Sequence, residues 1–114
     1  MVTILSKEVL SEVLGVEAKI IKIYNDEFWI ELGEEDEKMY NMYQLAHLCK
    51  VWAYRVNEYS IESGCDNCSG WAYIRDRNSC SDDQAIERVI ADTEVEAIFK
   101  ATMWIYNKEK NNGC

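Results

Sequence analysis

Residues 42–56, MYQLAHLCKVWAYRV, decide the fold, because their apolar side chains recur with helical spacing. The spacing i, i+3, i+4, i+7 and onward is the one that a single face of an α-helix produces. His47 lies about 140° around such a helix from Met42, so it is predicted to face solvent and not to act together with Cys49. We therefore predict a helix over residues 39–55 whose buried face carries Met42, Leu45, Ala46, Cys49, Trp52, Ala53 and Val56.

A second long helix is predicted over residues 94–108. Residues 93–96, TEVE, have the T-x-x-E pattern of a capping box, which marks a helix start. Trp104 lies about 180° from Val95, on the face opposite the apolar one. It therefore either packs on the N-terminal hairpin or anchors a partner. The apolar face consists of Val95, Ile98, Phe99, Thr102, Ile105 and Tyr106.

Three short strands are predicted between the two helices, over residues 58–62, 71–75 and 85–91. Glycine, asparagine and serine separate them, as is typical of loops. Each helix has one apolar face to bury, and the strands need a cover. The simplest arrangement is an antiparallel sheet with both helices packed on it, in the order α-β-β-β-α over residues 39–108.

A smaller unit is predicted before this core. Ser6 can cap a helix over residues 7–14, and Gly15 supplies its C-terminal stop. Residues 16–24 are rich in β-branched side chains and predict a strand. The second strand of a hairpin carries Phe28, Ile30 and Leu32 on one face, after a turn at Asn25 and Asp26.

These elements together predict a single α+β domain over residues 1–114, in which an α-β-β extension (residues 1–33) precedes the α-β-β-β-α core. A chain of 114 residues has the size of one domain. No apolar run approaches the ~18 residues of a membrane span, and the N-terminus lacks the pattern of a signal peptide. We therefore expect a cytoplasmic protein with no membrane partner.

The charge of the chain is strongly negative: 12 Lys+Arg against 21 Asp+Glu give −9. A nucleic-acid backbone binder needs the opposite balance, so no direct nucleic-acid contact is expected. Residues 25–44 hold seven acids and one lysine, a local charge of −6. The densest run is Glu34, Glu35, Asp36 and Glu37. It is either a solvated loop leading into a first helical turn or an anionic patch that meets a basic surface on a partner.

The five cysteines, an odd number, argue against a disulfide framework and for a reducing compartment. Cys65 and Cys68 have CxxC spacing, and Cys80 follows. A closed zinc site needs four ligands, and this region has three. Free thiols in a turn are favoured over a zinc site at Cys65, Cys68 and Cys80, and no cofactor is expected. Cys114 belongs to a polar tail.

No catalytic motif is present: the sequence has no calcium loop, H-E-x-x-H, G-x-S-x-G or phosphate-binding glycine loop. The only histidine is His47, which leaves carboxylates as the remaining groups for acid–base chemistry. The sequence therefore favours a binding protein over an enzyme.

Three segments resemble a group of small phage- and prophage-encoded proteins of the phage α-β-α sandwich type. They are LSKEVLSEVLG at residues 5–15, LAHLCKVWA at residues 45–53, and ADTEVEAIFKA at residues 91–101 followed by Trp104 and Ile105. The family pattern has an LAHKCKEWA-like first helix and an ADTEPEAIFKACEWI-like last helix. The chain departs from it at Leu48, Val51, Val95, Thr102 and Met103.

The resemblance implies a setting and no catalytic residues. Small acidic phage proteins often act by binding host machinery, which makes an inhibitor of a host protein or protein–nucleic-acid complex with a basic surface, such as an anti-CRISPR or other anti-defence protein, the leading hypothesis. Its expected contact residues are Glu34, Glu35, Asp36, Glu37 and Trp104.

Two other functions stay open. One is a sponge for a nucleotide immune signal, with bases stacking on aromatic rings and phosphates on cations. The other is an antitoxin-like module or oligomeric scaffold. The residues that could bind a nucleotide are Trp71, Tyr73, Arg75 and Arg77, which otherwise form an ordinary sheet face.

Overall fold

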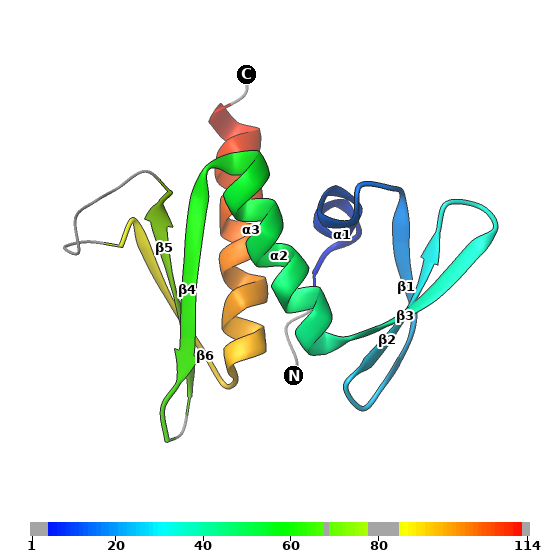
Figure 1. Cartoon of the computed structure of the whole chain (residues 1–114), viewed down its shortest axis with the longest axis horizontal. Coiled ribbons are helices and arrows are strands. Elements are labelled where there is room, and N and C mark those ends of the chain that lie inside the picture. The colour runs from blue at the N-terminus through cyan, green and yellow to red at the C-terminus, as the bar shows by residue number, and fades with distance from the viewer. Residues whose placement is uncertain (1–4, 68, 78–84, 113–114) are drawn as a thin grey trace.

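The computed structural model describes residues 5–67, 69–77 and 85–112 of the chain. Three helices and six strands follow one another in these parts, as Figure 1 shows. In chain order they are α1 (Lys7–Leu14), β1 (Ala18–Tyr24), β2 (Glu27–Leu32), β3 (Asp36–Asn41), α2 (Met42–Asn57), β4 (Tyr59–Cys65), β5 (Gly70–Asp76), β6 (Glu87–Ala91) and α3 (Glu94–Asn112).

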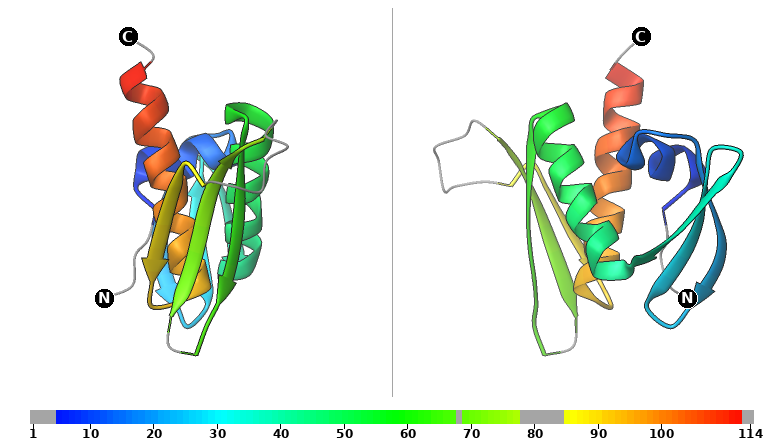
Figure 2. Two further views of the ribbon diagram at one scale, coloured as in Figure 1. Left: turned by 90° about the vertical axis from the view of Figure 1, so that its left-hand side faces the viewer. Right: turned by 45° about the vertical axis from the view of Figure 1, so that its right-hand side comes forward.

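The strands form two separate antiparallel sheets. Sheet A has the order β1-β2-β3, and sheet B has the order β4-β5-β6. Helices α2 and α3 lie between the two sheets, and α1 lies beside sheet A (Figure 1). The molecule is a slab of 45 × 39 × 19 Å, and its thin dimension is visible in the left view of Figure 2.

The middle helices contribute to two cores, one toward each sheet. The first core joins α1, sheet A and the helices, and it holds the large buried side chains Phe28 and Phe99, whose ring centroids are 6.2 Å apart. The second core packs small side chains of α2 and α3 against sheet B, where Ala72 and Ile74 of β5 are fully buried. Because α2 and α3 contribute side chains to both cores, they fix the position of sheet A relative to sheet B.

Local sequence signals account for several helix ends. Ser6 accepts a hydrogen bond from the Val9 amide at 3.3 Å, and Gly15 ends α1 in the left-handed region. Thr93 Oγ1 accepts from the Glu96 amide at 3.1 Å, so α3 starts where the capping pattern placed it. The predicted α+β class and the α-β-β-β-α order of the core are confirmed, with both helices on one face of sheet B.

The start of the first long helix was predicted too early. Residues 36–41 form β3, which pairs with β2 from Asp36↔Leu32 to Glu27↔Asn41. Asn41 then caps α2: its side chain accepts from the Tyr43 amide at 2.8 Å, and its own amide donates to Gln44 at 2.9 Å. The run Glu34–Glu37 is therefore the β2–β3 turn and the beginning of a strand, and the N-terminal unit has three strands instead of two.

The packing of α2 against α3 also buries one cysteine, Cys49. Cys49 of α2 is fully buried beside Thr102 of α3, whose hydroxyl donates to the Ile98 carbonyl at 2.7 Å. Burial raises the pKa of the Cys49 thiol from 9.0 to about 12, and a side-chain hydrogen bond with Thr102 opposes this shift by a smaller amount. The reactive thiolate is therefore suppressed at neutral pH.

We expect Cys49 to resist alkylation in the folded protein at pH 8, because it is both inaccessible and protonated, whereas exposed Cys65 is labelled. Iodoacetamide labelling followed by peptide mass spectrometry measures both sites in one sample. In denaturant both should be labelled. Equal labelling of Cys49 and Cys65 in native buffer would contradict the packing of α2 on α3.

Candidate functional site: an acidic groove at the helix N-termini

A cavity of about 870 Å³ lies at the end of the slab where α2 and α3 begin. The β1–β2 turn forms one wall and the β4–β5 turn forms the other, at the lower edge of Figure 1. We call this cavity the acidic groove. It is lined by Ile23, Asn25, Asp26, Phe28, Met42, Tyr43, Cys65, Asp66, Asn67, Ser69, Asp92, Thr93, Glu94, Val95 and Glu96.

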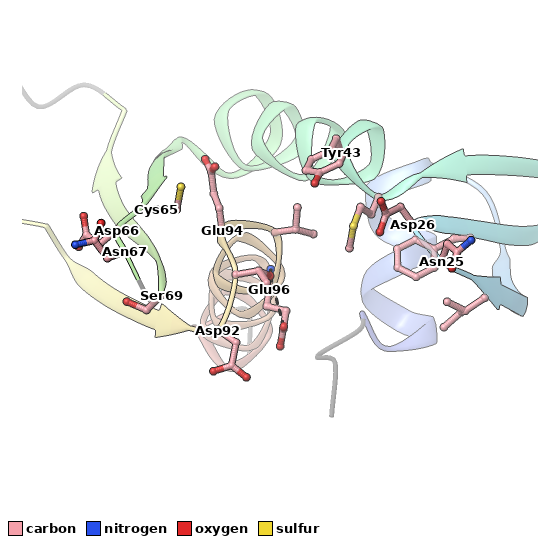
Figure 3. A pocket seen from close by; sticks show the side chains of 15 residues that line it. Asn25, Asp26, Tyr43, Cys65, Asp66, Asn67, Ser69, Asp92, Glu94 and Glu96 are labelled. Atoms are coloured by element: carbon pink, nitrogen blue, oxygen red, sulfur yellow. Dashed lines mark hydrogen bonds between the residues drawn. The ribbon is translucent and has the colours of Figure 1, made fainter.

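Five carboxylates face or border the acidic groove, from three separate parts of the chain. Asp66 stands on one wall, Asp26 on the other, and Asp92, Glu94 and Glu96 lie between them at the start of α3 (Figure 3). No lysine, arginine or histidine is among the described residues that line it. A cavity with one sign of charge concentrates ions and charged groups of the opposite sign.

Two of the five carboxylates form hydrogen bonds with hydroxyl groups of the protein. Glu94 accepts a hydrogen bond from the Ser63 hydroxyl of β4 at 2.7 Å, which ties the helix start to sheet B. Glu96 is buried, and its carboxylate lies 3.4 Å from the Thr93 hydroxyl. Acidic side chains in the first turn of a helix are stabilised by the helix dipole. These two acids therefore occupy the α3 N-terminus that an anionic ligand would otherwise use.

The other three carboxylates are open to solvent. Asp26, Asp66 and Asp92 are exposed, and no cationic side chain among the described residues pairs with any of them. The backbones of two of them form hydrogen bonds: the Asp26 carbonyl accepts from the Met42 amide at 2.7 Å, and the Asp66 amide donates to the Ser69 carbonyl at 2.8 Å. With no cationic partner in the described parts of the chain, the three carboxylates can accept hydrogen bonds from a cationic group.

Apolar side chains line the same cavity. Phe28 and Val95 are buried beneath it, while Ile23 and Tyr43 are 47% and 64% exposed at its border. Figure 3 shows Tyr43 on the side of the groove toward α2. Apolar surface beneath acids suits a segment that combines positive charges with apolar side chains, since charge alone would leave the apolar part unmatched.

The acidic patch predicted from the sequence lies away from the acidic groove. Glu34, Glu35, Asp36 and Glu37 are all exposed, but they lie at the β2–β3 turn, at the opposite end of sheet A from the β1–β2 turn that borders the groove. Trp104 is not near them. It is half-buried on α3 and packs on the side of sheet B instead of on the N-terminal hairpin.

The immediate neighbour of Trp104 is Tyr59 of β4, in an edge-to-face contact with ring centroids 6.4 Å apart. The Lys108 ammonium lies 5.1 Å from the Trp104 ring. The pKa of Tyr59 is raised, first by burial and then by the nearby Glu109 carboxylate. The Trp104 ring thus packs the C-terminal half of α3 against β4.

The predicted nucleotide-binding residues are brought together only in part. Trp71, Tyr73 and Arg75 share the outer face of β5, and the rings of Trp71 and Tyr73 are 4.8 Å apart. Arg77 turns toward α2 instead: its guanidinium donates to the Tyr54 carbonyl at 2.8 Å and pairs with Glu58 at 3.0 Å. Arg77 therefore completes the C-terminus of α2.

The zinc hypothesis concerns residues that the structure covers only in part. Cys65 is exposed at the end of β4, whereas Cys68, Cys80 and Cys114 fall outside the described residues. Within the parts that are described, no group of three or more His, Cys, Asp or Glu side chains is placed to hold a metal ion. His47 is exposed on α2, away from the groove.

The chain matches no protein-family model, no curated protein and no solved structure. Its own geometry is therefore the basis for assigning the chemistry of the acidic groove. No helix in the described parts of the chain has the length and apolar character that crossing a bilayer requires.

Proposed function

We propose that this protein acts by binding, and that its acidic groove holds a basic segment of a partner protein. The observation that carries the proposal is the placement of Asp26, Asp66 and Asp92, three exposed residues that line a partly apolar cavity and have no cationic partner within residues 5–67, 69–77 and 85–112. Lysine or arginine side chains would meet the acids, and intervening apolar side chains would contact Ile23 and Tyr43.

The resemblance of the sequence to phage proteins supports a phage-infected or prophage-bearing bacterial cell as the setting for this activity. In that setting the partner is a host protein or protein–nucleic-acid complex in the bacterial cytoplasm, such as a defence effector. Proteins that handle nucleic acids carry basic grooves, and a segment from such a surface has the charge that the acidic groove fits. Occupying that segment would inhibit the complex without any bond being made or broken. A basic toxin would present the same chemistry.

The nucleotide-sponge alternative has less support from the geometry. Arg75 pairs with Glu62 at 3.8 Å and Arg77 with Glu58 at 3.0 Å, so these two guanidinium groups already have carboxylate partners. A phosphate would have to compete with them.

The test compares two triple charge reversals that change the net charge equally. The first variant, D26K/D66K/D92K, removes the open acids of the groove. The matched control, E34K/E35K/D36K, acts on the β2–β3 turn. A labelled peptide that alternates arginine and leucine serves as the probe, measured by fluorescence anisotropy. We expect the groove variant to bind on the order of 100-fold more weakly and the control to stay within about threefold of the native protein.

The opposite pattern, in which only the β2–β3 variant loses binding, would move the site to the predicted patch. Equal loss in both variants would mean that net charge alone attracts the peptide. A peptide with glutamate in place of arginine should not bind the native protein. Binding of the arginine peptide should weaken as ionic strength rises, since exposed charges are screened beyond about 10 Å at 0.1 M.

A further inference from the structure

A second cavity adjoins the acidic groove at Tyr43. Its volume is about 560 Å³, and it lies where β3 runs beside the first turns of α2. We call it the basic pocket. The side chains used below are those of Lys38, Tyr40, Tyr43, Gln44, His47 and Leu48. Because Tyr43 lines both cavities, a ligand that leaves the acidic groove past this ring enters the basic pocket.

The basic pocket has the opposite charge to the acidic groove. Its charged or titratable lining groups are the Lys38 ammonium and the His47 imidazole, and no aspartate or glutamate is among the described residues that line it. Both side chains are exposed, and no carboxylate among the described residues forms an ion pair with either. Two adjoining cavities of this small protein therefore attract groups of opposite sign.

The register of β3 places Lys38 on the side of sheet A that faces α2. Lys38 pairs with Ile30 of β2, which is fully buried, and Tyr40 pairs with Phe28, which is also buried. Residues opposite one another in an antiparallel pair share a face of the sheet. The Lys38 ammonium also lies 5.1 Å from the centre of the Tyr40 ring, a contact that draws it toward α2.

The polar groups of the basic pocket are mainly hydrogen-bond donors. The Gln44 side-chain oxygen accepts from the Asn41 amide at 2.9 Å, so its amide nitrogen is the atom that can meet a ligand. The Lys38 ammonium has three donors and no acceptor. Half-buried Tyr40 and Leu48 add apolar surface beside them. Donors next to apolar surface suit a carboxylate that is flanked by an apolar side chain.

We propose that the partner segment is bipartite: its basic part occupies the acidic groove, and an acidic part beyond it occupies the basic pocket. This inference rests on the proposed function and adds to it the sequence class of the segment. His47 lies one helical turn beyond Tyr43, a rise of about 6 Å along α2. Two residues of extended chain span about 7 Å, so a short spacer joins the two parts.

The basic pocket would give the acidic groove a means of choosing among basic segments. A wholly basic segment that continues past Tyr43 brings its next cation toward Lys38, and this repulsion opposes binding. A segment that changes sign at that point meets attraction in both cavities. The net charge of −9 makes this prediction specific, because the protein as a whole repels an added acid. Only a local positive site can make an acidic extension strengthen binding.

The test extends the arginine–leucine peptide by a two-residue spacer and a short tail. The acidic tail carries two glutamates around a leucine, and the neutral tail has glutamines in their place. Each tail is attached at either end of the peptide, so both chain directions are sampled. In fluorescence anisotropy, the acidic tail should tighten binding about threefold to tenfold over the neutral tail in one of the two directions.

Two lysine reversals with the same change in net charge locate the effect. K38E places an acid in the basic pocket, so the acidic-tailed peptide should now bind no more tightly than the neutral-tailed one. K19E is the matched control, because exposed Lys19 pairs with Glu31 on the opposite face of sheet A. It should keep the preference for the acidic tail. The neutral-tailed peptide should bind both variants within about threefold of the native protein, which shows that the fold and the acidic groove are intact.

The outcomes separate this inference from the proposed function. If the neutral-tailed peptide binds through the acidic groove but the acidic tail adds nothing in either direction, the bipartite segment is overturned and the proposed function stands. Loss of the preference in K19E as well as K38E would also overturn it. A detached acidic tail that binds as tightly as the whole peptide would assign the basic pocket to a separate ligand. If D26K/D66K/D92K leaves binding of the neutral-tailed peptide unchanged, both proposals fail.

Discussion

Phe99→Ala is expected to lower the free energy of unfolding by about 3–5 kcal/mol. Phe99 is fully buried in α3, and its ring meets Phe28 of β2 in the core that joins the helices to sheet A. Truncation removes this contact and leaves a cavity that neighbouring side chains fill only in part. A native domain of this size is stable by roughly 5–15 kcal/mol, so the loss is a large share of the total.

Urea unfolding followed by circular dichroism measures the effect. Tyr24→Ala is the control, because Tyr24 is an aromatic residue of sheet A that is 60% exposed, and its truncation should cost about 0.5 kcal/mol or less. Phe28 also lines the acidic groove, so Phe99→Ala should weaken binding of the arginine–leucine peptide as well. A cost for Phe99→Ala no greater than that for Tyr24→Ala would contradict the packing between α3 and sheet A.

Gly70→Ala is expected to cost about 3 kcal/mol, although it adds only one methyl group. A Cβ at Gly70 would lie 2.1 Å from the Glu94 amide nitrogen and 2.1 Å from the Thr93 carbonyl carbon. Both are backbone atoms at the start of α3, so relief requires the whole helix end to move away from β5. The same movement displaces Asp92 and Glu94, which should reduce peptide binding.

Gly64→Ala is the matched comparison on the neighbouring strand. Its added Cβ meets the side chain of Trp71 instead of backbone, and that side chain lies on the open face of sheet B. We expect a cost of about 1 kcal/mol and unchanged peptide binding. Thermal or urea unfolding of both variants gives the comparison. If Gly70→Ala were as mild as Gly64→Ala, α3 would not approach β5 as closely as the structure requires.

Local interactions explain why much of the fold could be predicted from sequence. The Ser6 cap, the Gly15 stop and the Thr93 cap each act within a few residues, so the helix boundaries that depend on them are visible in the sequence. The same holds for β5, where buried residues alternate with half-buried ones. Strand β3 lacks this signal. Its residues 36–39 are exposed on both faces, and it is held mainly by backbone pairing with β2.

The acidic groove could not be predicted because it depends on tertiary structure. Asp26, Asp66 and Asp92 are far apart in sequence, and each alone resembles an ordinary turn or capping acid. A partial signal was present: all three adjoin the end of a helix or strand, and antiparallel connections bring such ends to one side of a domain. The run Glu34–Glu37 dominated the charge pattern because it is contiguous, although the β2–β3 hairpin carries it away from the acidic groove.

Nuclear magnetic resonance of the ¹⁵N-labelled protein tests the central claim most directly, by locating where the arginine–leucine peptide binds. Titration should shift the amide signals of the β1–β2 turn, the β4–β5 turn and residues 92–96, which line the acidic groove, and leave residues 34–37 in place. Shifts centred on residues 34–37, or spread evenly over every acidic surface, would show that the groove does not select the basic segment.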